Sequence, residues 1–419
     1  MISLPSGKID LVINTSKTPN LNKNPALSLL EIEHAAFCKS EDQLAARPLS
    51  EEFAINVVWQ KLPREYIDLN AEELDDRIHK AKNLLGQRVL VLGHHYQREE
   101  VIKYADLQGD SFLLSQEAAS RPESDFIVFC GVHFMAETAR VLCSPRQRVI
   151  LPNMAAGCSM ADMAPTDDVL DAWDDLQNIL GSNAPVVPVT YMNSTAEIKA
   201  LCGRNGGIVC TSSNAAAVME WAFERGSQVL FLPDQHLGRN TALKMGIDAS
   251  QMLVWNPFKP LGGHDADRIR SAKVILWQGH CSVHTRFSVK QILSARERVP
   301  DVKVIVHPEC TMETVRAADM VGSTEMIRKT INESPPGSSW AVGTEISLVN
   351  RLAKQNPDKG VFCLDPIVCP CSTMYRIHPA YLAWTLERLL VDEVVNEITV
   401  GDDISKDAYI ALNRMLQVT

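Results

Sequence analysis

The chain has 419 residues, of which 46% are apolar and 22% charged, a composition typical of a globular protein with two or three domains. Its formal net charge of −10 disfavours nucleic acid as a partner, because phosphate backbones bind to basic faces. No apolar run approaches the roughly 18 residues of a membrane span, and the N-terminus lacks the apolar segment of a secretory signal. We therefore expect a cytoplasmic protein without a membrane partner, in which the 11 cysteines do not form a disulfide framework.

The chain begins with a largely polar segment, and we predict an N-terminal extension over residues 1–60. A helical pattern follows from Leu62 to Gly86 and ends on that glycine. From residue 89 onwards, short apolar runs alternate with helical stretches. This alternation predicts strand–helix units around buried parallel strands.

Four strand-to-helix junctions recur three times along the chain. The first series runs from VLVLGHHYQ to VILPNMAAGC, the second from VVPVTYMNSTAEI to VILWQGHC, and the third from VKVIVHPECTMETV to FCLDPIVC. We therefore predict an α/β fold of three αβα domains with pseudo-threefold symmetry, each with a short parallel sheet, around a central active site. The predicted boundaries are residues 61–180, 181–298 and 299–385, with a C-terminal helical segment over 386–419 that packs back on the core.

Polar side chains follow the first two junctions of every series. Because ligands bind at the carboxyl ends of parallel strands, three domains facing one axis would bring these side chains into one cavity. Hydroxyl groups at helix starts favour phosphate or carboxylate, while histidine, tyrosine and glutamate can transfer protons. We favour Ser213 over Ser212 by its match to Ser111 and Thr324. The candidates are His94, Tyr96, Tyr191, Asn193, His307 and Glu309 after the first junctions, and Ser111, Ser213 and Thr324 after the second.

Each series ends in a cysteine, namely Cys158, Cys281 and Cys369, and the symmetry would let these three distant thiolates meet. A zinc ion with one open position is one candidate ligand. A [4Fe–4S] cluster is the favoured one, because three cysteines leave one of its irons free to act as a Lewis acid. The alternatives are a zinc-dependent lyase or hydrolase and a non-catalytic iron–sulfur protein. A redox role is conceivable for Cys363 or Cys371.

From about residue 85 to the end, the chain resembles the quinolinate synthase family. The motifs that carry the resemblance include HHYQ (94–97), GDS (109–111), CGVHFMAETA (130–139), GCSMAD (157–162), YMNSTAEIKA (191–200), WQGHCSVH (277–284), HPEC (307–310) and CP (369–370). The resemblance implies an enzyme of NAD biosynthesis that condenses iminoaspartate with dihydroxyacetone phosphate and releases phosphate and water to form quinolinate. It also implies small-molecule substrates and transient contact with L-aspartate oxidase or dehydrogenase.

The resemblance further assigns roles to single residues. It implies a [4Fe–4S] cluster held by Cys158, Cys281 and Cys369, with the free iron as a Lewis acid. Cys369 is preferred to Cys371 because a proline follows it, as in the family, although the CxxCxxC run of some members is absent from CLDPIVCPC. The catalytic residues implied are Tyr96, Tyr191, His307 and Glu309, and the substrate-binding residues are His94, Ser111, Tyr191, Asn193, Ser213, His307, Glu309 and Thr324.

Overall fold

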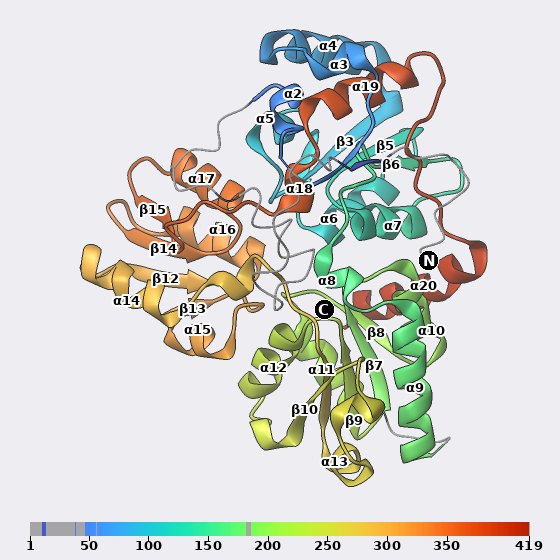
Figure 1. The fold of residues 1–419 in the computed structure, drawn as a ribbon, viewed down its shortest axis with the longest axis vertical. Helices are drawn as coiled ribbons and strands as arrows, with labels where there is room; N and C mark the ends of the chain where they lie inside the picture. Colours follow the sequence, from blue (N-terminus) through green and yellow to red (C-terminus); the bar gives the residue numbers. More distant parts are fainter. Residues whose placement is uncertain (1–10, 14–37, 39–46, 56, 182–185, 419) are drawn as a thin grey trace.

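The structure is a computed structural model that describes residues 11–13, 38, 47–55, 57–181 and 186–418. Three parallel β-sheets form three lobes around a common centre, with the first lobe at the top of Figure 1, the second at the bottom and the third at the left. This arrangement confirms the predicted α/β class with three short parallel sheets. The domain boundaries themselves stay a prediction.

The first lobe contains a four-stranded sheet in the order β4–β3–β5–β6, in which all neighbouring strands are parallel. Every residue of the central strands β3 and β5 is buried, as expected for a sheet covered on both faces. The strands are β3 (Val89–His94), β4 (Leu107–Gly109), β5 (Phe126–Cys130) and β6 (Arg148–Ile150), and the helices are α4 (Ala71–Leu85), α5 (Glu99–Ile102), α6 (Ser111–Ala119), α7 (His133–Leu142) and α8 (Ser159–Asp162).

The second lobe has five parallel strands in the order β10–β11–β9–β7–β8. Only four of them were predicted from the sequence, and the strand that was not predicted is MLVW (252–255). Residues of α9 pack into the core of this lobe although the helix was assigned to the first. The strands are β7 (Val186–Tyr191), β8 (Ile208–Cys210), β9 (Gln228–Leu232), β10 (Met252–Trp255) and β11 (Val274–Trp277), and the helices are α9 (Thr166–Leu180), α10 (Ala196–Arg204), α11 (Ala215–Phe223), α12 (Gln235–Lys244) and α13 (Ala266–Ser271).

The third lobe returns to four parallel strands, in the order β13–β12–β14–β15. Its strand order matches that of the first lobe, with the first strand of each series second in the sheet. The strands are β12 (Lys303–Val306), β13 (Met320–Val321), β14 (Ser339–Gly343) and β15 (Gly360–Cys363), and the helices are α14 (Val289–Arg298), α15 (Met312–Ala317), α16 (Thr324–Glu333) and α17 (Ile346–Gln355). Short 3₁₀ turns occur at η3 (Gly86–Arg88), η4 (Ala249–Gln251), η5 (Pro260–Gly263) and η6 (His284–Arg286).

The helical pattern over 62–86 forms two helices, α3 (Arg64–Ile67) and α4. Asn70 divides them because its side chain caps α4, and Glu73 completes a capping box. Gly86 ends α4 with a φ of 54°, a left-handed value that favours glycine.

Most of the predicted N-terminal extension lies outside the described residues, but its last part belongs to the first lobe. The backbone of β1 (Leu11–Ile13) pairs antiparallel with β2 (Val58–Gln60), and α2 (Leu49–Glu52) precedes β2. Leu49 and Trp59 are buried in the same core as β3 and β5. Residues 47–60 therefore contribute to the core of the first lobe.

The C-terminal segment connects two lobes. After α18 (Ser372–Tyr375), α19 (Pro379–Leu389) packs against α4 of the first lobe, and α20 (Asp402–Leu416) packs against α10 of the second. Gly203 permits this close approach, because a Cβ atom there would lie 1.9 Å from the carbonyl oxygen of Asp407. Within the described ranges, no helix is long and apolar enough to cross a bilayer.

Candidate active site

The three lobes meet at a cavity of about 90 Å³. All but two of the residues predicted for the site line it, and they come from all three lobes. Those that do are His94, Tyr96, Ser111, Cys158, Tyr191, Asn193, Cys281, His307, Glu309 and Thr324. Cys369 and Ser213 are the exceptions.

Equivalent strands place the aromatic and acidic side chains of the site. His94 is the last residue of β3, Tyr191 is the last residue of β7, and His307 directly follows β12. Each strand is flanked by parallel neighbours, so its carboxyl end points to the centre of the molecule together with those of the other two sheets. The pseudo-threefold repeat therefore explains why side chains about a hundred residues apart along the chain share one cavity.

Glu309 lies at the centre of a buried polar network. Its Oε2 accepts a hydrogen bond from Nδ1 of His284 (2.9 Å), and its Oε1 lies 3.7 Å from Nδ1 of His307. Burial alone raises the pKa of Glu309, but the neighbouring His307 and His284 and the hydrogen bonds outweigh it and lower the pKa below its usual range. The carboxyl group is therefore ionised at neutral pH and can accept a proton.

A chain of hydrogen bonds connects Glu309 to Tyr96. Nδ1 of His284 donates to the carboxylate, and its Nε2 forms a hydrogen bond of 3.1 Å with Oγ1 of Thr344. Oγ1 of Thr344 in turn lies 2.8 Å from the Tyr96 hydroxyl, which also contacts Oγ1 of Thr324 at 2.9 Å. The chain crosses from the third lobe to the first.

Burial holds four side chains of the site in their neutral forms, namely Tyr96, Tyr191, His94 and His307. Burial raises the pKa of Tyr96 and of Tyr191 well above 10, and the charge of Glu309 adds to the shift at Tyr191. Burial lowers the pKa of His307 to about 3, and it lowers that of His94 as well. His307 also stacks on His284 with ring centroids 4.3 Å apart. At neutral pH the tyrosines are therefore donors and His307 is uncharged.

Hydroxyl groups at three helix starts line the cavity. Ser111 and Thr324 are the first residues of α6 and α16, and both are buried. In the second lobe the cavity is lined by Ser212, while Ser213 is exposed and lines a separate cavity. The structure therefore places Ser212, the residue before the predicted Ser213, against the central cavity.

One cysteine from each lobe reaches the cavity, and these are Cys158, Cys281 and Cys371. Burial raises the pKa of each thiol, and the negative charge of Glu309 raises the pKa of Cys281 further. Three thiols that are costly to ionise alone would ionise readily against a bound cation. Ligand atoms of Cys281, His284 and Glu309 also lie within 4.8 Å of one another, as in a metal site.

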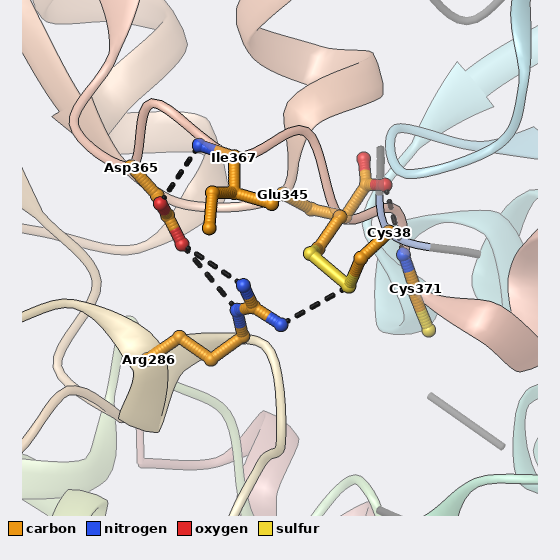
Figure 2. The surroundings of a disulfide bond; sticks show 7 residues. Cys38, Arg286, Glu345, Asp365, Ile367 and Cys371 are labelled. Carbon is orange, nitrogen blue, oxygen red and sulfur yellow. Dashed lines mark hydrogen bonds and ion pairs between the residues drawn. A yellow bond between two sulfur atoms is a disulfide. The ribbon is translucent and has the colours of Figure 1, made fainter. Parts of the chain in front are cut away.

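Cys369 does not lie with the other two predicted cysteines. Its sulfur is bonded to Cys38, as Figure 2 shows, so it has no free thiolate to offer a metal. Arg286 donates to the sulfur of Cys38 at 3.1 Å and forms an ion pair with Asp365. The backbone N–H of Cys371 donates instead to the buried Glu345 (3.1 Å), which fixes the turn that carries Cys371 into the cavity. The other nine cysteines are free.

Cys371 shares sequence features with the other two cysteines that line the cavity. Cys158, Cys281 and Cys371 are each followed by serine, whereas Cys369 is followed by proline. Cys158 and Cys371 are also the N-cap residues of the short helices α8 and α18, and each lies eight residues beyond the end of β6 or β15 (158 − 150 and 371 − 363). No role was predicted for His284, although it lies three residues after Cys281.

Three α/β lobes that enclose one site of thiols, imidazoles, tyrosines and a carboxylate define an enzyme built by repetition around its active site. The family model described as quinolinate synthetase A protein matches residues 76–417. The chain therefore belongs to the quinolinate synthase family.

Curated relatives named quinolinate synthase support this membership. The protein from Corynebacterium glutamicum is 59% identical over 359 residues, which cover 86% of this chain and 91% of that protein. The protein from Nocardioides sp. is 57% identical over 82% of this chain and 89% of its own length. The protein from Herpetosiphon aurantiacus is 53% identical over 87% of this chain and 97% of its own length.

Proposed function

We propose that the chain condenses iminoaspartate with dihydroxyacetone phosphate to form quinolinate, with loss of phosphate and water. The observation that carries the proposal is the meeting of one thiol from each lobe with an ionised Glu309 in one cavity. Three thiols suit a [4Fe–4S] cluster with one iron free of protein ligands. We therefore propose Cys158, Cys281 and Cys371 as its ligands.

The bound cluster would supply a Lewis acid for an oxygen of the substrate. The protein supplies the anion contacts. Ser111 and Thr324 begin helices of nine and ten residues, and Ser212 lies just before a helix of nine, so residues with hydroxyl groups at three helix starts line the cavity together. Helix N-termini favour negative charge, so these three positions suit the phosphate of the triose substrate.

Proton transfer falls to the network around Glu309. The ionised carboxylate accepts a proton, and His284 and Thr344 connect it to the neutral hydroxyl of Tyr96. Tyr191, whose pKa burial also raises, is a second donor beside Glu309. Condensation, loss of water and ring closure each require a proton to be removed at one atom and delivered at another, which this chain of groups provides.

The position of the cavity between three lobes has a chemical purpose in this proposal. An imine hydrolyses in water, and substrates that fill a site enclosed by three lobes would displace the water from it. His94 and Asn193, which line the same space, would orient the substrate.

The test is anaerobic purification with iron and sulfide analysis, followed by an assay of quinolinate from iminoaspartate and dihydroxyacetone phosphate. We expect about four irons and four sulfides per chain and formation of quinolinate. Zinc in place of iron, without quinolinate formation, would favour a zinc-dependent lyase or hydrolase that uses Cys281, His284 and Glu309. A loaded cluster without turnover would favour a non-catalytic iron–sulfur protein.

A further inference from the structure

A second, larger cavity adjoins the active site between the second and third lobes. Its volume is about 720 Å³, against about 90 Å³ for the central cavity. Ser212 and Ser323 line both cavities, so the two spaces adjoin at the helix starts that offer hydroxyls to an anion. The larger cavity therefore lies beside the part of the active site that suits phosphate.

The wall of this cavity is fixed by contacts between lobes. Asn240 on α12 donates from Nδ2 to the carbonyl oxygens of Pro308 and Cys310, both at 2.8 Å. Helices α12 and α15 lie side by side at this boundary (Figure 1). Hydrogen bonds between the second and third lobes therefore fix one side of this cavity.

The charge of the cavity lining is entirely positive. Lys244 and Arg316 are its only charged residues, both are exposed, and neither forms an ion pair among the described residues. They lie in the last turns of α12 and α15, where a cation also complements the helix dipole. The helix dipole accounts for one cation in the last turn of each helix. It does not account for the fact that both cations line a cavity whose lining contains no carboxylate.

We propose that this cavity is the vestibule through which anionic substrate reaches the active site, and that Lys244 and Arg316 attract it. The inference rests on the proposed function, whose triose phosphate and dicarboxylate imine are both anions. The chain as a whole carries a net charge of −10, which repels such molecules. Two unpaired cations at the opening offset that repulsion locally and raise the rate of productive encounter.

The test is charge reversal of both residues in the cluster-loaded enzyme, with Lys244→Glu and Arg316→Glu combined. At low ionic strength (about 0.01 M, Debye length about 30 Å) we expect kcat/KM for dihydroxyacetone phosphate to fall about tenfold or more, with kcat unchanged. At about 1 M, where the Debye length is about 3 Å, the difference should disappear. Both residues are exposed, so the iron content should stay at that of the wild type.

A matched control carries the same change of charge elsewhere. Lys290 on α14 and Lys354 on α17 are exposed and lie outside both cavities, and their combined change to glutamate should leave kcat/KM within about twofold. An equal loss in this control, or no loss in the vestibule variant at low salt, would overturn the inference.

A second measurement separates this inference from the proposed function. Inorganic phosphate binding to the loaded protein by calorimetry needs no turnover, and the vestibule variant should bind it more weakly than the control at low salt. If the wild type forms no quinolinate but this difference is found, the proposed reaction fails and the anion vestibule stands. Equal phosphate affinity in both variants, together with equal kcat/KM wherever turnover occurs, contradicts the vestibule.

Discussion

The first and third lobes each place one cysteine in the central cavity, but they differ in the segment that precedes this cysteine. In both, a cysteine eight residues beyond the last strand occupies the N-cap position of a short helix and lines the central cavity. The segment before Cys158 makes no disulfide, whereas the segment before Cys371 contains Cys369, which is bonded to Cys38. The comparison teaches that the repeat conserves the position of the cysteine relative to the following helix and leaves the preceding segment free to vary.

Substitution of Cys371 should have the largest effect on iron content and activity, and it tests the comparison of the two lobes most directly. Cys371→Ala removes one of the three thiols in the cavity, so we expect loss of the cluster and of activity. Cys369→Ala removes a sulfur that lies in a disulfide outside that cavity, so iron content and activity should persist. Iron and sulfide analysis of both variants after anaerobic reconstitution decides between them. Full iron in Cys371→Ala with loss in Cys369→Ala would reverse the assignment.

The choice between these two cysteines shows how much of the site could be predicted from the sequence. Periodic apolar runs and repeated polar junctions are local features, so the three sheets were predicted correctly, and most of the residues proposed for the site line the cavity. Whether Cys369 or Cys371 enters the cavity depends on the turn that Glu345 fixes by accepting from the Cys371 backbone, and this contact spans 26 residues. The pairing of Cys38 with Cys369 spans 331 residues and left no local pattern to find.

Two other features of the site also depend on the path of the backbone and on contacts between lobes. Ser212 and Ser213 are adjacent hydroxyls, and only the path of the backbone before α11 decides which one faces the cavity. Thr344 follows the strand β14, yet its partners Tyr96 and His284 come from other junctions of the repeat. Sequence therefore predicted which strand ends meet, and the packing between lobes decided which atoms touch.

The next largest effect, a fall in kcat, is expected at the carboxyl end of the first strand, where the first and third lobes carry different side chains. The first lobe places His94 and Tyr96 there, whereas the third places His307 and the carboxylate of Glu309. Glu309→Gln keeps the size of the side chain but removes the charge that accepts a proton. We expect kcat to fall by about 10² to 10⁴ with the cluster retained. Steady-state kinetics with iron analysis tests this, and a loss below tenfold would remove Glu309 from proton transfer.

A smaller effect is expected where the two lobes are joined by Thr344. Thr344→Val keeps the shape but breaks the hydrogen bonds to Tyr96 and His284, so kcat should fall about tenfold, in line with one or two buried hydrogen bonds. Thr344→Ser should restore most of the rate because it restores the hydroxyl. The KM for dihydroxyacetone phosphate should stay the same in both, since Thr344 does not line the cavity. Equal rates for the valine and serine variants would show that the hydroxyl is not used.

The smallest effect on activity, but a clear one on stability, should follow from the disulfide that only the third lobe has. Cys38→Ser opens a covalent link between residues 331 positions apart. Such a link restricts the unfolded chain, so its loss should lower the free energy of unfolding by about 2–4 kcal/mol. Activity and iron content should stay at the wild-type level, because neither sulfur of the disulfide lines the central cavity.

Thermal unfolding under anaerobic conditions, with and without a thiol reductant, measures this difference. The reductant should lower the unfolding temperature of the wild type to that of Cys38→Ser and leave the variant itself unchanged. A variant that also loses iron would mean that the disulfide holds the Cys371 turn in place, and the first and third lobes would then differ in how they keep the metal as well as in how they fold. Retained iron with reduced stability would instead confirm that Glu345 and the N-cap position of Cys371 suffice to place the thiol, as the N-cap position does for Cys158.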